Sequence, residues 1–324
     1  MDKVMLGRSG LKVSPICFGT WELGGEWGVY DDKAATAAIQ RARELDVNFF
    51  DTAQGYGFGE SEQVLGRALA AETHTNREEV VIATKGGLRQ RDGHLVRDSS
   101  RDWLRAGVDA SLEALNVDFI DLYQVHWPDP TTSFDETGEA LAELVESGKV
   151  RHVGVSNFDP QQMAALAEHC PVETLQPPYD MFRRRVESTQ LPYCAANDIG
   201  VLVYGPLAHG LLTGGMRHST VFSADDWRSH SPDFLGQTFD QNLAVVRRLQ
   251  ALATDRDVSL PAMAVAWTLA NPAVDAAIVG TRNPDHLQDI VGAVDVALTA
   301  ADLEAIDAIL ADSTPMHGPA PEGM

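Results

Sequence analysis

The sequence predicts an α/β protein of the (β/α)8 barrel class with a β-hairpin at its N-terminus. Along the 324 residues, short apolar runs alternate with longer amphipathic stretches, and eight such pairs follow one another. The runs VVIAT, VLVY and AAIVG are apolar on both faces, as expected of strands in a buried parallel sheet. Eight strands that are each followed by a helix are what a closed barrel of this kind requires, although a doubly wound sheet would show the same alternation.

The predicted elements follow in chain order. The segment VMLGRSGLKV predicts a small hairpin that turns at Ser9-Gly10. Strands are expected at Ile16–Phe18, Asn48–Asp51, Val80–Thr84, Ile120–Val125, His152–Val155, Thr174–Gln176, Val201–Tyr204 and Ala276–Val279. Helices are expected at Asp31–Leu45, Ser61–Ala71, Ser100–Leu115, Thr137–Ser147, Pro160–His169, Ser188–Asn197, Gln241–Asp255 and Pro261–Asn271. The first helix opens with an acidic cap, and Ser61 is a candidate N-cap of the second.

Neither a repeat nor a linker divides the chain, so we expect a single domain over residues 1–312. The segment Gly205–Phe239 is long for a loop, and loops of this length are usually functional or mobile. Residues 313–324, STPMHGPAPEGM, are rich in proline and glycine, which predicts a tail that is flexible or lies on the surface.

The composition excludes several classes of function. The chain carries 47 acidic and 25 basic residues, a net charge of −22, which argues against binding to nucleic acid or to an anionic membrane. Cys17, Cys170 and Cys194 are scattered and show no metal-ligand spacing, which fits a reducing cytoplasm. The N-terminus has no apolar signal core, and no apolar run approaches the roughly 18 residues of a membrane span. The sequence leaves open whether the protein is a monomer or a homo-oligomer.

Four side chains that could share one proton-donating site occur where predicted strands end. Asp51 and Tyr56 lie in FFDTAQGYGFGESEQVLGRAL, Lys85 ends VVIATKG, and His126 ends IDLYQVHWPD. A phenol can donate a proton to a carbonyl oxygen if an amine holds its pKa down, a carboxylate holds the amine, and an imidazole aims the carbonyl. The carboxyl ends of barrel strands are where active sites of this fold lie.

Each of the four also has an ordinary structural interpretation. Asp51 could form a turn or cap a helix, and Tyr56 could be an aromatic of a glycine-rich loop. Lys85 could be a solvated strand end, and His126 a hydrogen-bonded structural histidine. Taken singly these interpretations are as good as the catalytic one, and only the joint occurrence of the four in this order favours catalysis.

Over nearly its whole length the chain resembles the aldo-keto reductase superfamily. The motifs FDTAQGYGFGESEQVLGRAL, HVGVSNF, YGPLAHGLLTGG and AIVGTRNPDHL occur in the order of that family, and the first is highly specific. The resemblance is to its bacterial, potassium-channel-β-subunit-like branch. It implies a TIM barrel and an oxidoreductase in which Asp51, Tyr56, Lys85 and His126 are the catalytic tetrad, with Tyr56 protonating the alkoxide after hydride transfer from a nicotinamide.

The resemblance also implies where NADPH would bind. Ser156, Asn157 and Gln176 match residues that hold the carboxamide, although a Ser-Asn pair could equally cap the next helix. Tyr204 matches an aromatic that stacks on the nicotinamide ring. The remaining matches lie along the pyrophosphate and at the 2′-phosphate end: Gly205, Pro206, Leu207, Gly210, Leu211, Gly280, Thr281, Arg282, His286 and Gln288.

At the adenosine end the chain departs from the family pattern. Arg282 could pair with a 2′-phosphate through its planar guanidinium. His286 and Ile290, however, stand where many relatives carry Arg or Gln, and Asn, and Ile290 cannot hydrogen-bond the adenine. NADPH is therefore the expected cofactor, with NADH as the alternative.

Trp21, in FGTWELGG, and Trp127, beside His126, are expected to wall a pocket for a small carbonyl substrate. No GxGxxG follows a strand in the manner of a Rossmann dehydrogenase, because Glu60 replaces the last glycine of GYGFGE. A different hypothesis is a redox sensor or regulatory subunit that binds NADP(H) and turns over slowly. We expect a docking arm in such a subunit, and find none before the hairpin.

Overall fold

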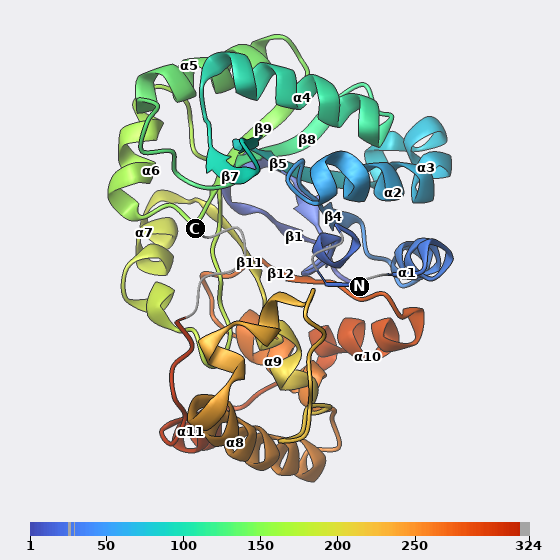
Figure 1. Cartoon of the computed structure of the whole chain (residues 1–324), viewed down its shortest axis with the longest axis vertical. Helices are drawn as coiled ribbons and strands as arrows, with labels where there is room; N and C mark the ends of the chain where they lie inside the picture. Colours follow the sequence, from blue (N-terminus) through green and yellow to red (C-terminus); the bar gives the residue numbers. More distant parts are fainter. Residues whose placement is uncertain (25–26, 29, 318–324) are drawn as a thin grey trace.

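The computed structural model describes residues 1–24, 27–28 and 30–317. Within them, eight parallel strands form a closed barrel in the order β3-β4-β5-β8-β9-β10-β11-β12 (Figure 1). The barrel strands are β3 Ile16–Gly19, β4 Phe49–Asp51, β5 Val81–Gly86, β8 Ile120–Val125, β9 Val150–Ser156, β10 Thr174–Gln176, β11 Gly200–Tyr204 and β12 Ala276–Val279. Each predicted strand is present within two residues of its expected ends, and the predicted barrel is confirmed.

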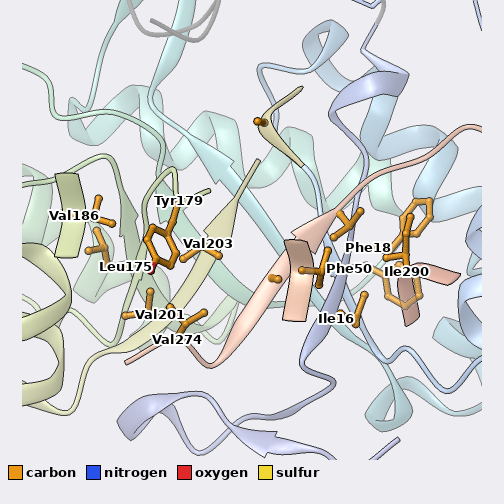
Figure 2. Close-up of a cluster of buried hydrophobic side chains, with 14 of the residues drawn as sticks. Ile16, Phe18, Phe50, Leu175, Tyr179, Val186, Val201, Val203, Val274 and Ile290 are labelled. Carbon is orange, nitrogen blue, oxygen red and sulfur yellow. The ribbon is translucent and has the colours of Figure 1, made fainter. Parts of the chain in front are cut away.

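Helices surround the strands (Figure 1). They are α1 Asp32–Glu44, α2 Glu60–Ala68, α3 Ala70–Thr75, α4 Arg101–Leu115, α5 Phe134–Glu146, α6 Pro160–Ala167, α7 Gln190–Asn197, α8 Gly236–Asp255, α9 Leu260–Leu269, α10 Leu287–Val291 and α11 Ala300–Leu310. Their buried faces pack against the outer, apolar face of the barrel. Figure 2 shows part of this layer, where Phe18 and Phe50 lie beside Ile290 of α10.

The pairing register brings the carboxyl ends of the strands to one rim of the barrel. Gly19 of β3 is the partner of Asp51 of β4, and Gln176 of β10 is the partner of Ser156 of β9. Strand β12 pairs with β3 and closes the barrel. Side chains that follow successive strands are therefore held around one opening, whatever path the loops take.

The N-terminal hairpin covers the opposite end of the barrel. β1 Val4–Met5 pairs with β2 Lys12–Val13, as predicted, and a 3₁₀ turn at Gly7–Ser9 joins them. A methyl group on Gly200, the first residue of β11, would lie 2.7 Å from the carbonyl carbon of Leu6. Only a glycine at position 200 allows this close approach of hairpin and strand.

Several expected element boundaries need correction. Ser61 does not cap α2: its hydroxyl is buried and donates to Thr20, and Gly59 is the N-cap residue. The helix expected at Ser61–Ala71 is divided into α2 and α3. The helix expected from Gln241 begins at Gly236, so the irregular segment is shorter than predicted and contains 3₁₀ turns at Ala208–Thr213, Trp227–Ser229 and Pro232–Phe234.

Some elements had no counterpart in the sequence prediction. A second hairpin, β6 Leu88–Arg91 with β7 His94–Arg97, follows β5, and the helices α10 and α11 follow β12. The β6–β7 strands carry charged residues on partly exposed faces, so they show neither the apolar runs of the barrel strands nor a helical period.

The first residues of the C-terminal tail pack against the domain. Thr314 exchanges two backbone hydrogen bonds of 2.9 Å with the side chain of Asn242 in α8. Met316 is 2 % exposed and donates its N–H to the carbonyl of Phe182. Residues 318–324 of the expected tail lie outside the described part.

No helix in the described residues is long and apolar enough to cross a membrane. Cys17, Cys170 and Cys194 are free thiols, and all three are buried.

Candidate active site

The residues predicted from strand ends meet at the carboxyl rim of the barrel. Asp51 is the last residue of β4, Lys85 lies one residue before the end of β5, and His126 directly follows β8. Tyr56 comes from the loop between β4 and α2, where Gly57 has a positive φ of 61° that favours glycine. The closed parallel sheet thus gathers four side chains that are up to 75 residues apart in sequence.

Lys85 is the centre of this group. Its ammonium donates hydrogen bonds to Asp51 Oδ1 at 2.5 Å, to the carbonyl of Thr52 at 2.9 Å and to the phenol oxygen of Tyr56 at 3.2 Å. The side chain is fully buried, so three acceptors satisfy its three donors in a place that water does not reach. These three contacts hold the amine in one position.

Asp51 is fixed from two sides. Its Oδ2 accepts a hydrogen bond of 2.9 Å from the amide of Gln176, while Oδ1 accepts from Lys85. Burial raises the pKa of Asp51, and the charge of Lys85 and the amides of Gln176 and Gln124 offset that effect only in part. Removal of Lys85 would leave this carboxyl buried without its counter-charge.

The imidazole of His126 stands edge-on to the phenol ring of Tyr56, with 5.7 Å between ring centroids. Burial lowers the pKa of His126 well below its ordinary value, and the charge of Lys85 lowers it further. At neutral pH the ring is therefore uncharged. A neutral imidazole beside a phenol can hydrogen-bond an oxygen atom without competing with the phenol as an acid.

The predicted carboxamide-binding residues form a second polar group on the same rim. Asn157, with a left-handed φ of 63°, donates to the carbonyl of His126 at 3.0 Å and accepts from the hydroxyl of Tyr204 at 2.9 Å. The hydroxyl of Ser156 donates to the carbonyl of Gln176. Asn157 does not cap α6, because Asp159 is the N-cap and forms a capping box with Gln162.

These groups open into a cavity of about 820 Å³, a size typical of ligand pockets. Most of the predicted site residues line it: Trp21, Asp51, Tyr56, His126, Ser156, Asn157, Gln176, Tyr204, Gly205, Pro206, Leu207, Gly210, Gly280, Thr281, Arg282 and His286. Trp21 lies with its ring roughly parallel to that of Tyr56, at 6.3 Å between centroids. Aromatic, amide and charged groups thus face one space.

Four predicted site residues do not line the cavity. Lys85 lies behind Tyr56 and donates a hydrogen bond to its phenol oxygen. Trp127 lies under the guanidinium of Arg97, and Leu211 is fully buried. Gln288 is exposed and accepts a hydrogen bond from Arg41 of α1. Trp127 is therefore not part of the cavity wall, and Gln288 contacts Arg41 of α1 outside the cavity.

Further residues that were not predicted also line the cavity, and Glu22, His209 and Arg228 are among them. Arg228 and His209 belong to the irregular segment after β11, where no periodicity marks a residue as inward-facing. Arg228 pairs with Asp226 at 2.6 Å and donates to the carbonyl of His209. Glu22 directly follows Trp21, a predicted pocket residue, and this position in the sequence could have identified Glu22 as a candidate for the cavity wall.

His209 is buried in the cavity wall. Its Nε2 accepts a hydrogen bond of 2.5 Å from Arg183, which in turn donates to Asp233 at 3.0 Å. Burial and the nearby charges of Arg183 and Arg228 lower the pKa of His209 well below its ordinary value. The proton of this neutral ring therefore resides on Nδ1.

Comparison with known proteins agrees with this geometry. Residues 15–311 match the model of the Aldo/keto reductase family. The chain is 39 % identical to aldo-keto reductase YhdN of Bacillus subtilis, over 96 % of this chain and 94 % of the relative. It is 33 % identical to a probable voltage-gated potassium channel subunit beta of Arabidopsis thaliana, over 94 % and 95 %.

A solved structure shares both the fold and much of the sequence. The glycerol dehydrogenase AKR11B4 from Gluconobacter oxydans superposes with a TM-score of 0.88, at 38 % identity, over 99 % of this chain and 98 % of that chain. The predicted resemblance, including its bacterial and channel-subunit-like character, is thereby confirmed. This chain is a member of the aldo/keto reductase family of oxidoreductases.

Proposed function

We propose that the protein reduces small aldehydes or ketones to alcohols with NADPH, or oxidises a polyol or sugar in the reverse direction, and that Tyr56 is its general acid. The observation that carries this proposal is the chain of contacts from Asp51 through Lys85 to Tyr56, which ends at the wall of the cavity. A phenol in contact with a buried ammonium is suited to give up a proton.

Each residue of the tetrad has a separate part in this proposal. Tyr56 donates its phenolic proton to the carbonyl oxygen as negative charge develops there. Lys85, 3.2 Å from the phenol oxygen, stabilises the tyrosinate that remains, and Asp51 holds Lys85 in place. Neutral His126 donates a hydrogen bond to the same carbonyl oxygen and orients it. The tyrosinate regains its proton from solvent after the product leaves.

The residues around the cavity fit a nicotinamide dinucleotide, which would supply the hydride to the carbonyl carbon. Ser156, Asn157 and Gln176 are the proposed partners of the carboxamide, and the ring of Tyr204 is the proposed stacking surface. Gly205 and Gly210 have positive φ values of 70° and 92°, which leave their backbones open to a phosphate. Pro206, Leu207 and Leu211 belong to the same segment.

Among the described residues that line the cavity, Arg228 and Arg282 supply guanidinium groups for the phosphates. Arg282 favours NADPH, because NADPH carries the additional 2′-phosphate. Against that preference stand Asp285 and Asp289, which line the same end, and Ile290, whose apolar side chain packs on the barrel. We therefore propose NADPH as the preferred cofactor and NADH as a second cofactor.

The proposed substrate is a small carbonyl compound bound between Trp21 and the tetrad. The similarity to a protein described as a glycerol dehydrogenase supports short polyols as substrates of the reverse reaction. An aromatic wall suits both an apolar carbonyl compound and the face of a sugar.

Replacement of Tyr56 by Phe tests the acid role. We expect kcat for an activated aromatic aldehyde to fall by about 100- to 10,000-fold, the usual contribution of a general acid. The dissociation constant for NADPH, measured by fluorescence titration, should stay within about twofold. Tyr193→Phe on α7, outside the cavity, is the matched control. Undiminished turnover in Tyr56→Phe would remove Tyr56 from the acid role.

The similarity to a probable potassium channel subunit beta supports a second candidate function, that of a redox sensor. Both functions require cofactor binding, and they differ in turnover. Binding of NADPH without turnover on a broad panel of aldehydes, ketones and polyols would favour the sensor. Turnover at rates typical of enzymes, from about 1 s⁻¹ upward, would favour the reductase.

A further inference from the structure

Glu22 carries a carboxylate into the part of the cavity where the proposed cofactor needs positive charge. It lies in the short 3₁₀ turn Trp21–Leu23, which follows β3. Its carboxylate is pressed against the start of the loop after β12: a methyl group on Gly280 would collide with Oε2 of Glu22. Gly280 thus provides the space that the carboxylate occupies.

The two guanidinium groups that act on Glu22 lie close together, because both contact Trp27: Arg282 donates to its carbonyl and Arg228 lies over its ring. Burial raises the pKa of Glu22 to about 7, and the guanidinium groups of Arg282 and then Arg228 act in the opposite direction. Asp226 already pairs with Arg228, and Arg282 donates to the carbonyl of Trp27 at 3.3 Å. Glu22 is therefore an additional anion that both arginines attract across the same space.

A cofactor phosphate would require the same arginines. Two anions cannot share a partly desolvated pair of guanidinium groups without repulsion, because Coulomb interactions are strong where water is excluded. The carboxylate must therefore be displaced or neutralised when a phosphate binds. Arg228 also donates to the carbonyl of His209, in the segment that the proposed function places along the pyrophosphate, so Glu22 opposes a phosphate that NADH and NADPH share.

Building on the proposed function, we propose that Glu22 is an internal competitor of the cofactor: its carboxylate takes the place of the pyrophosphate opposite Arg228 and weakens the binding of NADH and NADPH alike. The arginines thus have a counter-charge in the absence of the dinucleotide. The cofactor is bound less tightly than the two arginines would otherwise allow, which speeds its release.

Glu22→Gln tests this competition, because the amide keeps the size of the side chain and removes its charge. We expect NADH and NADPH each to bind about 5- to 10-fold more tightly, the effect of removing about 1 kcal/mol of repulsion. Glu304→Gln is the matched control, since Glu304 is an exposed acid on α11 that does not line the cavity. It should change neither affinity by more than about twofold. Circular dichroism verifies that each variant is folded.

The pH dependence of cofactor affinity in the wild-type protein is a second test, and it does not depend on whether a variant folds. With NADH as the probe, affinity should be highest below pH 7 and fall toward pH 9 as Glu22 ionises, and it should be flat in Glu22→Gln. The other charged or titratable groups that face this space are the same in both proteins: Arg228, Arg282, Asp226, His209, Asp285, His286 and Asp289.

Each outcome decides the matter. Tighter binding of both cofactors by Glu22→Gln, with the pH dependence removed, supports the competitor. Unchanged or weaker binding overturns it, as does equal tightening in Glu304→Gln, which would show a general charge effect. Tightening for NADPH alone would also overturn it, because Glu22 would then oppose the 2′-phosphate. Failure of the wild-type protein to bind either nucleotide would instead overturn the proposed function.

Discussion

At the scale of single residues, the side chains of the tetrad depend on each other. Lys85 is buried and hydrogen-bonded to Asp51 and two further acceptors, and Asp51 is held by Gln176 on its other oxygen. Gln176, expected to bind the cofactor, therefore also supports the carboxylate. A residue at a strand end of this barrel can serve the proton donor and the cofactor site together.

Arg282→Ala tests the cofactor preference at this scale. We expect the dissociation constant for NADPH to rise about 10-fold more than that for NADH, because a charge-assisted bond to the 2′-phosphate is lost. Fluorescence titration with both nucleotides measures the ratio. Arg248→Ala, which removes an exposed arginine paired with Asp312, is the control. An equal loss for both nucleotides would mean that Arg282 contacts a phosphate that they share.

At the scale of elements, the barrel strands were predictable and the segments between them much less so. A buried parallel strand requires apolar residues on both faces, and such runs stand out in the sequence. The β6–β7 hairpin and helix α10 have no such requirement, because they are short and partly exposed. Ser61 was misassigned for a related reason: tertiary contact with Thr20 uses the hydroxyl that would have capped the helix.

The contact between the hairpin and β11 predicts a sharp difference between two glycines. Gly200→Ala should lower the free energy of unfolding by about 1–3 kcal/mol, the usual cost of overpacking, because the new methyl group meets the backbone of Leu6 and Gly7. Gly292→Ala meets no atom within 4 Å and is the matched control. Thermal unfolding compares the two, and equal midpoints would show that the hairpin yields without cost.

At the scale of the whole molecule, the C-terminal tail joins parts of the chain that are distant in sequence. Met316 contacts Phe182, and the N–H of His317 donates to Asp233 at 3.3 Å. Asp233 accepts from Arg183, which donates to His209 in the cavity wall. The tail is thus connected by hydrogen bonds to the irregular segment that closes one side of the site.

Met316→Ala tests how much the tail contributes. Because this side chain is 2 % exposed, we expect a loss of about 2–5 kcal/mol in the free energy of unfolding. Hydrogen exchange of residues 205–235 should also become faster in the variant. Met5→Ala, where the side chain is 47 % exposed, should change stability by less than about 0.5 kcal/mol. Similar effects of the two substitutions would indicate that the tail is not part of the packed structure.

The sequence by itself determined the barrel and the meeting of Asp51, Tyr56, Lys85 and His126, because a closed parallel sheet brings every strand end to one rim. Only the tertiary structure decided that Glu22, His209 and Arg228 join that rim and that Trp127 and Gln288 do not. The physical reason is that strand positions follow from runs of apolar residues that can be recognised in the sequence. The path of a loop depends instead on packing between residues far apart in the chain, and such packing produces no periodic pattern in the sequence.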